Sequence, residues 1–87
     1  MSYKIKFKDG SVKEFGSLCG EDLVGADLHC ADLRGAKLSG ANLCDAVLRG
    51  TDMTGASLKD TDLRCATLEG VSLTGAHLDG VITDTEE

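Results

Sequence analysis

The chain has 87 residues and a formal net charge of −6, with 3% aromatic residues and no Trp or Pro. This length predicts a single domain with a modest core, and 41% apolar residues are too many for a disordered acidic segment. The acidic balance argues against direct binding to nucleic acid or to an anionic membrane, because both need a basic surface.

Targeting signals are not apparent in the sequence. No segment has the roughly 7–15 apolar residues of a secretory signal, or the ~20 of a membrane span. The sequence therefore predicts a cytoplasmic protein without membrane contact. Its four cysteines match no CxxC spacing and are expected to be reduced thiols: Cys19, Cys30, Cys44 and Cys65.

Residues 1–15 predict an N-terminal β-hairpin that caps the rest of the fold. In "YKIKFKDGSVKEF", apolar residues alternate with lysines up to Asp9-Gly10, a strong signal for a two-residue hairpin turn. Such a turn would place Val12 opposite Phe7. The lysine row could contact nucleic acid, but alternating lysines on an exposed strand are typical of solubility and edge protection, which is the interpretation we adopt.

Residues 16–80 are thirteen consecutive five-residue units, from GSLCG to AHLDG. The central residue is Leu in every unit except one, where it is Met53, and the residue two places before it is usually Ala. In a helix, five residues would turn the central side chain by about 140° from one unit to the next, because each residue turns about 100°. In a flat strand, successive central residues would fall on opposite faces. Neither element gives the repeated Leu a constant environment.

Each unit is therefore predicted to be a short extended piece followed by a turn that points every central residue to a common axis. Gly and Asp tolerate the turn conformations that such corners need. The Ala before each centre marks a second inward position, too cramped for a large side chain. The predicted core residues are Leu18, Leu23, Leu28, Leu33, Leu38, Leu43, Leu48, Met53, Leu58, Leu63, Leu68, Leu73 and Leu78.

The run of A-(D/N)-L-x-x units resembles the pentapeptide repeat family over residues 16–80. The resemblance implies an all-β fold, a right-handed quadrilateral β-helix with four units in each coil. Residues twenty apart would then stack along the coil axis. The expected columns include Asp22, Asn42 and Asp62, and separately Asp32, Asp52 and Ser72.

At residues 81–87, "VITDTEE", the repeat ends because Thr83 takes the place of the central Leu. We interpret this segment as an acidic tail. Since no helix or aromatic plug follows the last coil, two chains could stack there end to end as a homodimer. The tail could equally fold over the end or repel a second chain. The sequence leaves monomer and dimer open.

The sequence predicts no catalytic residue, no metal site and no cofactor. A slim coil packed with Leu and Ala offers no concavity for a substrate, so we expect a protein that is not an enzyme. Stacked carboxylates could bind Ca²⁺, but in the family consensus Asp or Asn commonly precedes the inward Leu for turn hydrogen bonding. The cysteines fall on different sides of the coil, except that Cys44 and Cys65 share one, and no zinc cluster follows.

Two functional hypotheses remain. The first is a non-enzymatic binding or scaffold module that presents polar residues to an unidentified protein partner. The second follows from the resemblance, because some similar proteins act as DNA mimics that inhibit or protect bacterial type II topoisomerases such as gyrase. The acidic body fits this idea, although the coil is short and its lysines and arginines interrupt the negative surface. The candidate acidic partner surface is Asp22, Asp32, Asp52 and Asp62.

Overall fold

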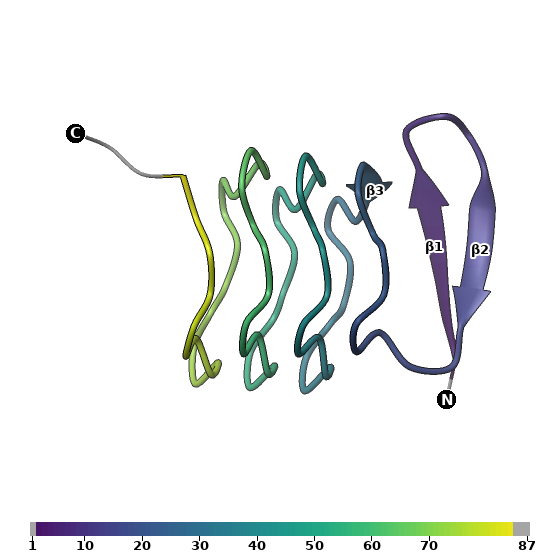
Figure 1. Ribbon diagram of the computed structural model, residues 1–87. Coiled ribbons are helices and arrows are strands. Elements are labelled where there is room, and N and C mark those ends of the chain that lie inside the picture. The colour runs from purple at the N-terminus through teal and green to yellow at the C-terminus, as the bar shows by residue number, and fades with distance from the viewer. Residues whose placement is uncertain (1, 85–87) are drawn as a thin grey trace.

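The computed structural model describes residues 2–84 of the chain. These residues form a hairpin followed by stacked coils, which run in chain order from the hairpin to the C-terminal end (Figure 1). The strands are β1 (Tyr3–Phe7), β2 (Val12–Phe15) and β3 (Ala26–Asp27), arranged in the order β2-β1-β3. Within the described residues there is no helix at all, hence none that could span a bilayer.

The hairpin forms, but its expected register is wrong by one residue. Val12 pairs with Lys6, and the amide of Phe7 donates to the carbonyl of Ser11 at 2.9 Å. The loop therefore has three residues, and it ends at Gly10 with a φ of 90°. A loop of this length needs a residue at positive φ in its last position, which Gly supplies without steric cost. The shift leaves Val12 on the outer face of the hairpin, where it is exposed.

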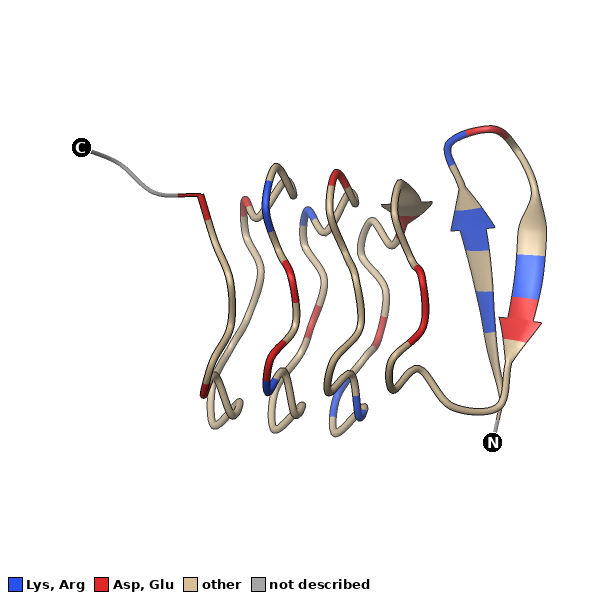
Figure 2. Cartoon of the chain, viewed as in Figure 1, with Lys and Arg blue, Asp and Glu red and all other residues tan. Residues whose placement is uncertain are grey.

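The hairpin packs against the first coil through β1. This strand pairs antiparallel with β3, with Phe7 opposite Ala26. Ile5 and Phe7 are buried in the core, and Tyr3 and Phe15 pack against it. The hairpin thus covers the apolar end of the first coil with one face, while Lys4 and Lys6 of β1 are exposed. Figure 2 marks the basic residues of both hairpin strands in blue.

The coils stack with a repeat of twenty residues. Parallel bridges join Asp22 to Asn42 and Asn42 to Asp62, and the same spacing recurs on all four sides. Each bridge is built from paired hydrogen bonds: the Leu23 amide donates to the Asn42 carbonyl at 2.8 Å, and the Asn42 amide donates to the Glu21 carbonyl at 2.9 Å. Four five-residue units per coil are thereby confirmed.

Each corner is a hydrogen-bonded turn. The amide of the small residue that opens a unit donates to the central carbonyl three residues earlier, as from Ala26 to Leu23 at 3.0 Å. The third residue of each such turn, which is the last residue of its five-residue unit, has a positive φ. Glycine tolerates this conformation best, and short polar residues follow. The corners without glycine are Cys30, Asp45, Asp60 and Cys65, with φ between 57° and 62°.

The central side chains fill the inside of the coil, together with the small residues. Thr51 and Thr61 occupy two of the small positions and are buried, and their hydroxyls donate at 2.7 Å to the carbonyls of Leu28 and Leu38. These hydrogen bonds compensate the cost of burying the hydroxyls. The bonds therefore explain how a pocket suited to Ala accepts Thr.

Burial decreases toward the last coil, and here the structure differs from the predicted core. Leu68 and Leu73 are only partly buried, and Leu78 is 42% exposed. Leu78 lies in the last described coil, where no described turn stacks on it. Residues 81–84, assigned to the tail in the sequence, extend the coil instead: Ile82 bridges to Asp62, and Asp84 accepts a hydrogen bond from the Cys65 amide at 3.0 Å. Residues 85–87 of the expected tail lie outside the described residues.

The corner at Gly50 allows a stability test. A Cβ added there would lie 3.0 Å from the Cys30 sulfur, at a φ of 72°, whereas one added at Gly55 would meet nothing within 4 Å at a φ of 71°. We expect Gly50→Ala and Gly55→Ala each to cost about 1–2 kcal/mol from the left-handed backbone, with a larger loss at Gly50. Thermal melts should show that the difference disappears when Cys30 is also replaced by Gly. A difference that persists in this background would mean that the sulfur contact is not its cause.

Candidate partner-binding surface

The coil has four sides, and one carries most of the negative charge. This acidic side comprises residues 21–25, 41–45, 61–65 and 81–84, and it holds five carboxylates against one arginine. On each of the other sides, the acidic residues exceed the basic ones by at most one. Figure 2 shows both acidic and basic residues on the coils, and more basic than acidic residues on the hairpin. The charged residues of the acidic side are Glu21, Asp22, Asp45, Asp62, Arg64 and Asp84.

The four aspartates proposed from the sequence do not form one surface. Asp22 and Asp62 share the acidic side, joined through Asn42, while Asp32 and Asp52 bridge to each other. Ten residues separate Asp22 from Asp32, which is half of a twenty-residue coil. The second pair therefore lies on the opposite side, so a partner that binds a single side contacts only two of the four.

These aspartates also have a structural role in the turns. In each one, Oδ1 accepts a hydrogen bond from the amide two residues later, at 3.1 Å for Asp22, 3.2 Å for Asp32, and 3.0 Å for Asp52 and Asp62. Asn42 makes the same bond at 3.0 Å, so the interaction does not need a charge. An Asx residue placed before a turn is favoured by this bond.

Two of the carboxylates are neutralised by an arginine two residues later. Arg64 donates to both oxygens of Asp62, with Nη2 to Oδ2 at 2.7 Å and Nε to Oδ1 at 3.0 Å. Arg34 contacts Asp32 in the same way, at 2.9 Å for both bonds. The Asp62 side chain is only 14% exposed. The charge of Asp62 is therefore poorly accessible to a partner, and Asp22 is the better candidate for contacting one.

The electrostatics of these groups follow from their hydrogen bonds. The side-chain bond from Arg64 holds the pKa of Asp62 below its ordinary value of 3.8, and Arg34 does the same to the pKa of Asp32. The pKa of Asp52 is lowered chiefly by the hydroxyl of Thr54, at 2.6 Å. All of these carboxylates are thus ionised at neutral pH.

The lowered pKa values predict loss of stability in acid. A carboxylate whose pKa is lower in the folded state stabilises the fold above its unfolded pKa, and this contribution is lost as the pH falls below about 3.8. Asp62→Asn retains the turn bond, as Asn42 does, but removes the ionised group. Melting temperatures measured between pH 7 and pH 3 should fall less for this variant than for the wild type. An equal fall would exclude Asp62 from the acid response.

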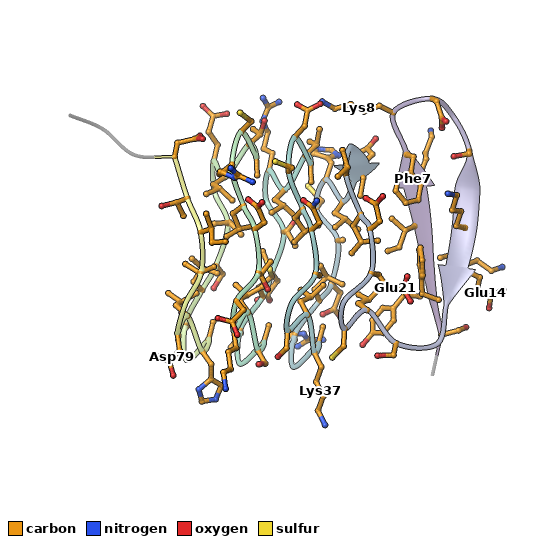
Figure 3. All side chains as sticks on the ribbon, in the orientation of Figure 1. Phe7, Lys8, Glu14, Glu21, Lys37 and Asp79 are labelled. Atoms are coloured by element: carbon orange, nitrogen blue, oxygen red, sulfur yellow. The ribbon has the colours of Figure 1, made fainter. Side chains whose placement is uncertain are left out.

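The hairpin reaches the acidic side at one end. Lys8 Nζ lies 3.1 Å from an Asp45 carboxylate oxygen, and the Lys8 amide donates to the Gly25 carbonyl at 3.1 Å. Lys8 extends from the hairpin tip toward the coils (Figure 3). A cleft of about 360 Å³ lies between hairpin and coil, lined among others by Phe7, Asp22 and Val24. Val24 is 45% exposed there, so the acidic side ends in a notch with an apolar wall.

The cysteines and histidines do not converge. Cys30 lies against Gly50 at one corner, while Cys65 Sγ lies 3.9 Å from an Asp84 carboxylate oxygen at another. His29 and His77 are exposed on different sides. Among residues 2–84, no three His, Cys, Asp or Glu side chains are placed to hold a metal ion.

Comparison with known proteins agrees with this geometry. The family described as "Pentapeptide repeats" matches residues 15–44 and 41–80, with eight copies. No curated protein sequence matches significantly. Among solved structures, the pentapeptide repeat protein Rfr23 from the cyanobacterium Cyanothece 51142 is 36% identical with a TM-score of 0.69, over 72% of this chain and 44% of that one.

A second similar structure is HetL, a pentapeptide repeat protein involved in heterocyst differentiation regulation in Nostoc sp. strain PCC 7120. It is 34% identical, with a TM-score of 0.34, over 72% of this chain and 34% of that one. The chain thus spans less than half the length of either protein. The family match over residues 15–80 and the 36% identity to Rfr23 establish that the chain belongs to the pentapeptide repeat family.

Proposed function

We propose that the protein is a non-enzymatic, cytoplasmic binding module whose acidic side docks a cationic segment of a protein partner. The supporting observation is that this side holds five carboxylates, offset by Arg64 and by Lys8 of the hairpin, while the other three sides are nearly balanced. Complementary charge of this kind steers association and selects the partner. The notch beside Val24 adds an apolar contact at the hairpin end.

The spacing of the acidic side suits an extended partner segment. Stacked strands lie about 4.8 Å apart, so Asp22 and Asp62, two coils apart, are separated by about 10 Å along the axis. A polyproline II segment rises about 3.1 Å per residue and returns to the same face every third residue, or about 9.3 Å. A basic side chain of such a segment would therefore reach Asp22, and the one three residues further along would lie over Asp62, whose charge Arg64 already offsets.

A labelled peptide with Lys at every third position and Pro between, titrated at low salt, tests this proposal. The acidic-side variant Glu21→Gln/Asp22→Asn should bind at least about tenfold more weakly, a loss of about 1.4 kcal/mol. The matched control is Asp32→Asn/Asp52→Asn, which removes the same charge from the opposite side and preserves the turn bonds. Equal weakening by both variants would show that net charge, and not the acidic side, determines binding.

A second candidate function is the DNA mimic that acts on a type II topoisomerase. The observation that favours it is that the negative groups of one side recur along the coil axis, as phosphates do along a duplex. A gyrase supercoiling assay with added protein tests it directly. Inhibition that the acidic-side variant loses would support this function, and no effect at tens of micromolar protein would reject it.

We also propose that two copies associate end to end through the last coil. Leu78 and Ile82 are both exposed there, on a described coil that has no further described turn against it. Sedimentation at tens of micromolar should then show a dimer that Leu78→Lys dissociates. A monomer at that concentration would contradict this association.

A further inference from the structure

A cleft opens where the base of the hairpin meets the first coil. It has a volume of about 510 Å³ and is distinct from the acidic notch. It lies where the chain leaves β2 and enters the first unit, beside the start of the second coil. Its lining is Tyr3, Gly16, Ser17, Leu18, Gly35 and Lys37.

The cleft coincides with a break in the hydrogen-bond ladder. One coil later, the Leu38 amide donates to the Ser57 carbonyl at 2.8 Å, and the Ser57 amide donates to the Ala36 carbonyl at 2.9 Å. The equivalent bonds would join Leu18 to Lys37 and Lys37 to Gly16. Within residues 2–84, neither bond forms. The amides of Leu18 and Lys37 are therefore left as donors in residues that line the cleft.

The carbonyls at this break are used differently. The Lys37 carbonyl has the Cys19 sulfur at 3.6 Å, a weak donor. The Gly16 carbonyl does not accept the hydrogen bond from the Lys37 amide that the ladder pattern predicts. The break therefore offers two amide donors and one available carbonyl. Backbone groups away from water are almost always hydrogen-bonded, so we expect solvent or a ligand to reach these three groups.

The side chains around the cleft add donors and positive charge. Lys37 is the one charged residue of the lining, in a chain whose net charge is −6. The Ser17 hydroxyl accepts a bond from the Cys19 amide at 3.3 Å, which leaves its own proton free to donate. Tyr3, whose side chain carries a second hydroxyl, also lines the cleft. A ligand that accepts hydrogen bonds and carries negative charge fits this set.

We infer that this cleft binds a small oxyanion of the phosphate or carboxylate class, independently of the acidic side. Lys37 lines the cleft, and the end of its side chain extends away from the coils (Figure 3). Rotation about its side-chain bonds brings the ammonium group back over the mouth, where it forms a charge-assisted bond. A protonated phosphate oxygen would also donate to the Gly16 carbonyl, so phosphate is expected to bind more tightly than acetate.

Separate titrations with inorganic phosphate and with acetate, followed by amide NMR shifts, test this inference. Both anions should give saturable shifts centred on the amides of Leu18 and Lys37, with phosphate saturating first. Saturation by acetate alone would overturn the phosphate assignment and leave a carboxylate site. Shifts that do not saturate, or that centre on the hairpin lysines, would overturn the site itself.

Two lysine variants test whether Lys37 contacts the bound anion. Lys37→Met keeps the stem and removes the charge, and it should weaken phosphate binding at least about tenfold. Lys59→Met is the matched control, because Lys59 is exposed on the same side of the next coil and does not line the cleft. Both variants retain the full core, so their amide spectra should remain folded. Equal weakening by the two would show non-specific attraction to lysine and contradict the inference.

Discussion

Replacing Leu43 by Ala is expected to lower the free energy of unfolding by about 2–5 kcal/mol. Leu43 is 0% exposed, and it lies in the second coil with another coil on either side. Its side chain is enclosed, and the close stacking of the coils leaves little freedom to fill the cavity. Loss of this size is a large part of the 5–15 kcal/mol that typically stabilises a domain. Chemical denaturation followed by circular dichroism measures it.

Leu78→Ala is the matched control for this prediction. It makes the same chemical change at the same position of a repeat unit, but Leu78 is 42% exposed. At protein concentrations too low for the proposed end-to-end association, much of its side chain is already in water, so truncation should cost less than half as much as at Leu43. Equal losses at the two positions would mean that the end of the coil is covered in solution.

Replacing Leu58 by Lys is expected to abolish folding. Leu58 is fully buried, and its neighbours inside the coil are apolar or, at Thr61, already hydrogen-bonded. A charged ammonium group there would have no acidic partner, and its desolvation would cost more than the fold can supply. An amide NMR spectrum with collapsed dispersion would be the expected result.

The control for Leu58→Lys is Val24→Lys, which adds the same charge at a half-exposed position beside the acidic notch. This variant should keep the dispersed spectrum of the wild type. If Leu58→Lys also gave a dispersed spectrum, the coil would have an interior able to admit water, contrary to its packing.

The repeat predicts the coil because a constant residue type requires a constant environment. Leu at every fifth position cannot share one face of a helix or a flat strand, so a turn in each unit is needed whatever surrounds it. The twenty-residue columns also follow from the sequence once four units per coil are assumed. These columns already separate Asp22 from Asp32, and the charges summed along each side of the coil indicate the acidic side.

Local pairing in the hairpin was less predictable. Asp9-Gly10 is compatible with both a two-residue and a three-residue loop, because both place Gly at positive φ. The structure adopts the longer loop, in which Asp9 accepts bonds from the Ser11 amide at 2.8 Å and hydroxyl at 2.7 Å. With the longer loop, Val12 pairs with Lys6 and not with Phe7. This shift of one residue places its side chain on the opposite face of the hairpin.

The coil, its apolar interior and the turn at each corner follow from the repeat alone, since these depend on contacts within a unit and between similar units. The position of the hairpin on the first coil does not follow from the repeat and is seen only in the folded structure. The Lys8–Asp45 ion pair, the notch beside Val24 and the ladder break at Lys37 all arise at that junction. There two different elements meet without a shared period, so side-chain packing between distant residues, and not the repeat, sets the geometry.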